Sequence, residues 1–153
     1  MRINKVRVKI EEDNFRKIAI TYEELNSTTG RNDTKMLEST EQPTPELLRA
    51  FKNLVPVAIY CGELPKDWEN KLSVSGLTFT WGSDDEYRVV IIAKRESTVG
   101  VPLNLSTPIR YVICSDDSNN NMPEQYIQLL KEVHSKVVGY IKGERSQAEL
   151  ELE

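Results

Sequence analysis

The chain has 153 residues, of which 39% are hydrophobic and 29% are charged, so it fits one globular domain that can bury a core without disulfides or bound metal. A net charge of −4 argues against binding to nucleic acid through a surface that is basic overall. No apolar run approaches the roughly 20 residues of a membrane helix, and the N-terminus lacks an apolar secretory segment, so we expect a cytoplasmic protein and no membrane partner.

The N-terminal residues predict an antiparallel hairpin. Apolar and basic residues alternate over 5–10, which is the period of a half-buried strand, and a polar turn at 11–14 separates it from a second strand at 15–22. Residues 26–43 are polar without clear periodicity, and we expect them to form a mobile loop.

A helix is predicted to begin at Thr44, because a hydroxyl N-cap followed by Pro45 and Glu46 is typical of a helix start. Because of Pro56, two secondary structures are possible for residues 56–61. Either the helix kinks at Pro56 and continues, with Gly62 as its stop, or it ends before Pro56 and a short strand follows. The continuing apolar stripe favours the kinked helix.

Residues 72–114 carry the clearest pattern of the chain. Strands are predicted at 72–81, 87–94 and 109–114, with a turn at 82–86 and a loop at 95–108. The apolar parity changes across Gly76, which predicts a bulge. The second of these strands is apolar on both sides at its centre, so we expect it in the middle of the sheet with both faces covered.

A last helix is predicted from Pro123 to Gly143, capped by Asn121 or a neighbour. The predicted order is ββαβββα. It indicates an α+β domain over residues 1–147, with a mainly antiparallel sheet of about five strands and two main helices. Residues 148–153 are expected to be a disordered tail, and the final Leu152-Glu153 can derive from a cloning vector.

Few residues offer catalytic chemistry. His134, the only histidine, lies in the apolar stripe of the last helix, which favours a histidine at the edge of the core with one hydrogen-bond partner. Cys61 and Cys114 sit in apolar surroundings without metal-ligand spacing, so we expect buried free thiols. No phosphate-binding glycine motif occurs, and no cofactor is expected.

Two candidate sites remain. Carboxylates in predicted turns could hold divalent cations, as in metal-dependent nucleases, although Asp is also favoured in turns for local hydrogen bonding. These are Asp84, Asp85, Asp116 and Asp117. The predicted hairpin could instead bind single-stranded nucleic acid through its basic side chains, with Tyr22, Trp81 or Tyr87 as stacking platforms. Its basic residues are Lys5, Arg7, Lys9, Arg16 and Lys17, which can equally form a solvated face that discourages edge aggregation.

Several segments resemble a group of uncharacterised proteins encoded by phages and prophages. The segments are 47–65, 72–80 (LSVSGLTFT), 102–108 (PLNLSTP) and 140–147 (YIKGERSQ). The chain differs from this group at 101–105, and the N-terminal hairpin is weakly covered. The resemblance implies a phage-genome origin, beside replication or recombination genes, and carries no catalytic residue over.

We therefore expect a non-enzymatic phage or prophage accessory protein that binds a partner in phage DNA metabolism or host takeover. The partner would be single-stranded nucleic acid or a phage or host protein. A metal-dependent enzyme acting on nucleic acid is the rival hypothesis, and a homo-oligomer formed through a sheet edge is a third.

Overall fold

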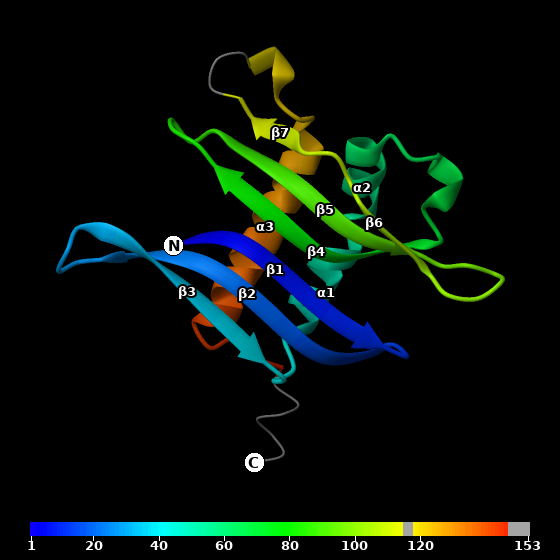
Figure 1. Ribbon diagram of the computed structural model, residues 1–153, viewed down its shortest axis with the longest axis horizontal. Helices are drawn as coiled ribbons and strands as arrows, with labels where there is room; N and C mark the ends of the chain where they lie inside the picture. The colour runs from blue at the N-terminus through cyan, green and yellow to red at the C-terminus, as the bar shows by residue number, and fades with distance from the viewer. Residues whose placement is uncertain (115–117, 147–153) are drawn as a thin grey trace.

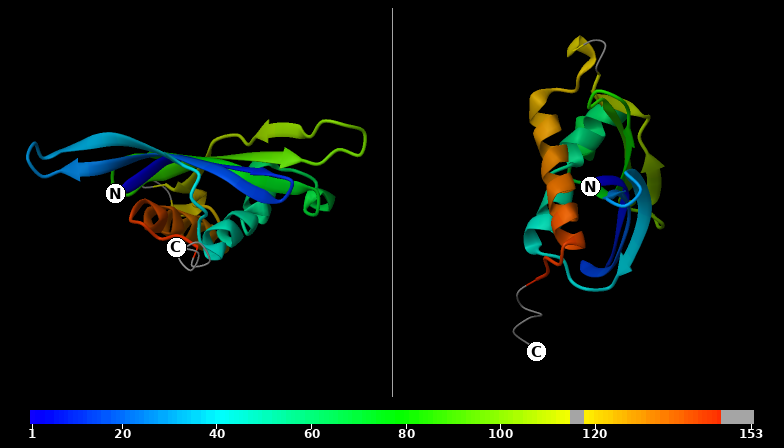
Figure 2. Two further views of the ribbon diagram at one scale, coloured as in Figure 1. Left: turned by 90° about the horizontal axis from the view of Figure 1, so that it is seen from below. Right: turned by 90° about the vertical axis from the view of Figure 1, so that its left-hand side faces the viewer.

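The computed structural model describes residues 1–114 and 118–146. It is an α+β fold in which seven strands form one sheet and every pairing is antiparallel. The strands follow the order β3-β2-β1-β4-β5-β6, and β7 also pairs with β5. The helices all lie on one side of this sheet, as the views in Figure 1 and Figure 2 show, so the other face of the sheet is open.

The predicted N-terminal hairpin is confirmed as β1 (Arg2–Glu11) and β2 (Asn14–Asn26). The expectation of a long loop over 26–43 is wrong for most of that stretch, because Arg31–Ser39 forms β3 and pairs with β2. This strand lies at the edge of the sheet and most of its side chains are exposed. An exposed edge strand needs no apolar alternation, which is why its sequence resembled a loop.

Two helices replace the predicted kinked helix. The first, α1 (Pro45–Lys52), begins as expected, with the Thr44 hydroxyl accepting a hydrogen bond from the Leu47 amide at 3.3 Å. The second, α2 (Val55–Gly62), follows after a break at residues 53–54 and holds Pro56 in its first turn, where proline costs no hydrogen bond. The alternative of a strand at 57–61 is wrong. The left-handed stop of α2 is Glu63 (φ 50°) rather than Gly62.

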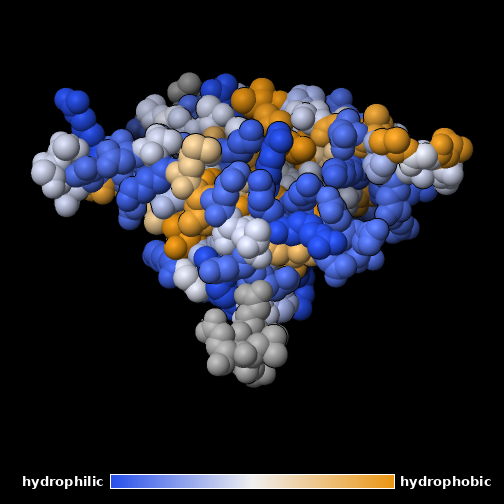
Figure 3. Space-filling view, turned by 60° about the horizontal axis from the view of Figure 1, so that its bottom comes forward, coloured by the Kyte–Doolittle hydropathy of each residue, from blue (hydrophilic) through white to orange (hydrophobic). Residues whose placement is uncertain are grey.

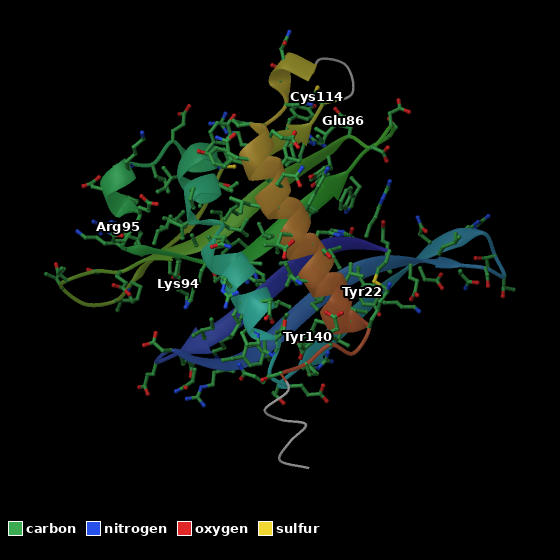
Figure 4. The ribbon with its side chains drawn as sticks, turned by 180° about the vertical axis from the view of Figure 1, so that it is seen from behind. Tyr22, Glu86, Lys94, Arg95, Cys114 and Tyr140 are labelled. Atoms are coloured by element: carbon green, nitrogen blue, oxygen red, sulfur yellow. The ribbon has the colours of Figure 1, made fainter. Side chains whose placement is uncertain are left out.

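A short helix, η1 (Lys66–Trp68), leads from α2 to β4. The Arg95 guanidinium lies 4.5 Å from the centroid of the Trp68 ring and ties η1 to the end of β5; Figure 4 labels Arg95. The predicted strands are confirmed as β4 (Leu72–Trp81) and β5 (Tyr87–Arg95), and the predicted bulge appears as a register shift between Val74 and Gly76.

The remaining strands are short and both pair with β5. They are β6 (Leu103–Ser106), which lies inside the predicted loop at 95–108, and β7 (Arg110–Ile113). The expectation that β5 is covered on both faces is wrong, because the helices cover one face only. The middle of the sheet is the β1–β4 pair, and β5 lies nearer the edge.

The last helix, α3 (Glu124–Ile141), follows a short 3₁₀ turn, η2 (Ser118–Asn120). Asn121 does not cap it, because its side-chain oxygen accepts a hydrogen bond from the Cys114 amide at 2.7 Å and Pro123 occupies the cap position. No described helix is long and apolar enough to cross a membrane.

The core lies between the sheet and the three main helices. It includes buried aliphatic side chains from the strands and from the helices, such as Val6, Leu77, Ile91, Val57 and Leu130. Tyr140 of α3 is also buried, and its hydroxyl donates to the Glu41 carbonyl at 2.7 Å; Figure 4 shows Tyr140 and Tyr22 at the same end of α3.

Candidate functional site

The face of the sheet turned away from the helices carries exposed polar and half-buried apolar side chains, in contrast to the core side. In β5, Val89 and Ile91 are fully buried, whereas their neighbours Val90 and Ile92 are only half-buried. The register places one row of residues straight across this open face. In that row Arg7 lies opposite Ala19 on one side and Gly76 on the other, and Ile92 continues it beyond Gly76.

A groove of about 700 Å³ lies on this open face. We call it the basic groove, because its lining holds four cationic residues and one acidic residue around apolar ones: Arg7, Lys9, Lys17 and Lys94, with Glu38, Ala19 and Ile92. Its volume is in the range of ordinary ligand-binding clefts, which is about 300–1,000 Å³. Its lining includes the short side chains of Ser75 from β4 and Ala19 from β2, and Gly76 lies beside Arg7 in the register.

Gly76 is required at this place because β1 approaches it closely. A Cβ atom on Gly76 would lie 2.8 Å from the Val6 carbonyl oxygen and 3.1 Å from Arg7 Cγ. The close approach lets the Arg7 side chain lie across the centre of the sheet. The bulge beside Gly76 turns the Ser75 hydroxyl toward the Ile92 carbonyl, to which it donates at 3.4 Å.

The charges of the groove are partly compensated. Lys17 contacts Glu38 at 3.4 Å and Lys9 contacts Glu11 at 3.3 Å, and all four side chains are about half exposed or more. Exposed ion pairs contribute about 0–1 kcal/mol, so an arriving anion can replace such a carboxylate at little cost. Arg7 and Lys94 form no salt bridge with any residue in the described part of the chain.

The structure separates the predicted basic residues. Arg7, Lys9 and Lys17 line the basic groove together. Lys5 points to the same face but lies beside a smaller hollow of about 150 Å³. Arg16 lies near the hairpin turn, 3.6 Å from Glu11, and does not line the groove.

The groove residues that the predicted site did not include come from all parts of the sheet, and the polar ones on β5 and β6 are Lys94, Asn104 and Ser106. Lys94 follows the buried Ala93, so the alternation of apolar and polar residues in this strand already placed the Lys94 side chain on the side opposite the core. No feature of the sequence indicated that β5 and β6 come close to β1. That proximity depends on the pairing of β1 with β4 and of β4 with β5.

The loop between β5 and β6 adds apolar surface next to the groove. It runs from Arg95 to Leu103, and the next register pair along, Lys94 and Asn104, lines the groove. Val99 and Val101 are 92% and 87% exposed in it. Figure 3 shows apolar atoms at the end of the molecule where Figure 1 places this loop, beside a mainly hydrophilic surface.

The aromatic residues proposed as stacking platforms do not reach the open face. Tyr22 and Tyr87 are buried on the helix side, and burial raises the pKa of the Tyr87 hydroxyl to about 12. Trp81 packs against the core, and its indole nitrogen donates to the Ile3 carbonyl at 2.8 Å. None of these three rings can therefore serve as a stacking platform on the open face.

His134 is the core-edge histidine that was predicted. Its Nε2 accepts a hydrogen bond from the Ile3 amide at 3.2 Å, and its ring meets Phe79 and Trp81 edge-on. Burial lowers the pKa of His134, and the positive charge of the N-terminus lowers it further. The neutral ring thus connects α3 to the start of β1.

The two thiols are free, as expected, but only Cys61 is fully buried, and Cys114 is half-buried. Burial raises the pKa of the Cys61 thiol to about 11, with the nearby charge of Arg110 acting in the opposite direction. A protonated thiol is a poor nucleophile and a poor metal ligand, so Cys61 serves packing.

The proposed metal site is only half within the described residues. Asp84 and Asp85 are exposed in the β4–β5 turn with φ values of 56° and 61°, whereas Asp116 and Asp117 lie outside the described residues. Convergence of the four carboxylates stays a prediction. Within residues 1–114 and 118–146, no three His, Cys, Asp or Glu side chains are grouped so that they could hold a metal ion.

Comparison with known protein families, with curated proteins and with solved structures found no match. The phage origin stays an expectation from the resemblance of residues 47–147. The site must therefore be interpreted from its own geometry and charge.

Proposed function

We propose that this chain is a non-enzymatic binding protein whose basic groove holds the backbone of a single-stranded nucleic acid. The observation that carries the proposal is the pair Arg7 and Lys94. Both line one groove, and neither forms a salt bridge within the described residues. Cations that face a groove without acidic partners provide the electrostatic attraction that phosphates require.

The surroundings of these cations favour an extended single strand over a compact anion. On β5, the open side runs from Lys94 through Ile92 and Val90 to Arg88, so cations flank two half-buried aliphatic side chains. At about 3.4 Å per residue this run spans roughly 20 Å. A single strand offers phosphates to the cations and unpaired bases to the aliphatic side chains, whereas the bases of a duplex are stacked inside the helix.

The net charge of −4 limits this proposal to a local interaction. Acidic residues elsewhere on the chain repel a polyanion, so binding should be strongest at low salt and weaken as salt rises. A role in phage DNA metabolism or host takeover is the biological setting that we propose, and the resemblance to phage-encoded proteins is its support.

The experiment is a titration of a fluorescently labelled oligothymidylate, followed by fluorescence anisotropy over a range of salt concentrations. Wild type is compared with the double variant Arg7→Gln/Lys94→Gln. The matched control is Lys52→Gln/Lys131→Gln, which removes two exposed lysines from α1 and α3 on the covered side.

The proposal predicts that log K falls linearly with log salt for wild type, with a slope of about −0.7 for each phosphate contact in a single strand. The groove variant should bind more weakly with a slope less negative by about 1.4, because two contacts are lost. The control variant should behave as wild type. Failure of wild type to bind at low salt, or an equal loss in both double variants, would refute the proposal.

A further inference from the structure

Tyr111 presents an aromatic ring on the open face, at the far end of β5 from the basic groove. The register pairs Tyr111 with Arg88, and Arg88 points away from the core because its neighbours Tyr87 and Val89 are buried. The residues on either side of Tyr111 in β7 point the opposite way, to the helix side. Val112 is fully buried, and Arg110 reaches the helix side, where its Nε donates to the Cys61 carbonyl at 3.0 Å.

The environment of Tyr111 distinguishes it from the other aromatic residues of the strands. Tyr111 is 42% exposed, whereas Phe15, Tyr22, Phe79, Trp81 and Tyr87 pack within or against the core. The Arg88 guanidinium lies 5.6 Å from the centroid of the Tyr111 ring. A planar cation at this distance attracts the ring and helps to hold it in one orientation.

We infer that Tyr111, held by Arg88, is a base-stacking site for single-stranded nucleic acid. This inference rests on the proposed function and deepens it, because it requires a ligand with unpaired bases and not merely a polyanion. A base stacks on an exposed aromatic ring largely irrespective of its identity, since every base has a π face. Arg88 supplies a charge for a phosphate beside that base.

The placement of the two sites suits one continuous ligand. Tyr111 is opposite Arg88 at one end of β5, and Lys94 lines the basic groove at the other. The half-buried side chains of Val90 and Ile92 lie between them on the same face. The ligand would cross the open face along β5, with its backbone in the groove and a base on the Tyr111 ring.

The test uses three ligands of equal length: an oligothymidylate, an oligouridylate and an abasic deoxyribose-phosphate oligomer. It compares wild type with Tyr111→Ala and Tyr111→Phe by anisotropy at fixed salt. Tyr111→Ala should weaken binding of both base-containing oligomers by about 5- to 150-fold and leave binding of the abasic oligomer unchanged. Tyr111→Phe keeps the ring and should bind as wild type.

Separate outcomes address the two proposals. If Tyr111→Ala binds the base-containing oligomers as tightly as wild type, or loses equal affinity for the abasic oligomer, the stacking site is refuted. In that case the proposed function still stands if Arg7→Gln/Lys94→Gln weakens binding. If wild type binds none of the three oligomers, both proposals fail. A preference for one of the two base-containing oligomers that persists in Tyr111→Ala would place the discrimination between them elsewhere, while the loss of affinity for both still supports stacking.

Discussion

The two faces of one sheet divide the work of this chain. On the covered face, strand residues meet the helices and are buried, as Val6, Leu77 and Ile91 are. On the open face, the intervening residues include Arg7, Lys94 and the short Ser75, and they line a groove. Successive residues of a strand point to opposite sides, so residues that are adjacent in sequence lie on different faces of the sheet. If the open face binds a ligand as proposed, substitutions on the two faces should change stability and binding separately.

The largest effect should separate two neighbouring isoleucines of β5. Ile91 points into the core and is fully buried, whereas Ile92 is half-buried and lines the basic groove. Ile91→Ala should lower the free energy of unfolding by about 2–5 kcal/mol, because it leaves a cavity. Ile92→Ala should lower it by less than about 1.5 kcal/mol, because that side chain already meets solvent.

Urea denaturation of both variants measures this difference. An equal loss of unfolding free energy in both variants would contradict the contrast between the two faces. Ile92 would then be covered in solution, as in a homo-oligomer formed through the open face. The mass of the protein in solution, measured beside the denaturation curves, shows whether such an oligomer exists.

A second, smaller effect is expected at Gly76, where one substitution should change both stability and binding. Gly76→Ala should lower the free energy of unfolding by about 1–3 kcal/mol, because the added methyl group meets the Val6 carbonyl oxygen and β1 must shift. The shift should also displace Arg7 and weaken oligonucleotide binding. Thermal or urea unfolding measures the first effect and anisotropy the second.

The control for this substitution is Gly82→Ala. Its added Cβ would meet the end of the flexible Glu86 side chain at 3.1 Å, which can move away. Its stability and binding should stay close to wild type. If Gly76→Ala is as well tolerated as Gly82→Ala, the close approach of β1 and β4 described here is not a constraint on the fold.

The smallest effect is a pH dependence on the covered face. Burial holds the pKa of His134 below its ordinary value of 6.5, so the unfolded chain binds a proton more readily than the folded one. The contribution of His134 to stability is therefore complete above pH 6.5 and decreases as pH falls from 6.5 through the lower pKa of the folded state. Urea denaturation at neutral and mildly acidic pH measures this loss.

His134→Gln provides the matched comparison, because a glutamine carbonyl can still accept the hydrogen bond from the Ile3 amide but does not titrate. The variant should lose less stability than wild type between the two pH values. An identical loss in both proteins would show that other groups cause the pH dependence.

Strands with strong alternation could be predicted from the sequence, and edge strands could not. Residues 72–81 and 87–95 carry buried residues at every second position, which made β4, β5 and the bulge at Gly76 recognisable. The strands β3 and β6 lie toward the margins of the sheet with mostly exposed side chains, so neither shows the buried alternation that identifies a strand. Alternation arises because one face of a strand is buried, and side chains at a sheet edge are buried less.

The candidate site was predictable only in the part that one hairpin contains. Alternation placed Arg7 and Lys9 on one side of β1, and the turn brought Lys17 beside them. Lys94 and Tyr111 join this face through long-range pairing, which no local pattern reveals. The side of the sheet on which Trp81 lies could not be predicted either, because it depends on which side the helices cover.

The most direct test of the account is an NMR titration that maps where a single-stranded oligonucleotide contacts the protein. The account predicts that amide and side-chain signals of open-face residues change, foremost those of Arg7, Ile92, Lys94 and Tyr111. Signals of α3 residues that face solvent, such as Lys131, should stay in place. Changes concentrated on α3, with none on β1 and β5, would contradict the claim that the open face of the sheet is the binding surface.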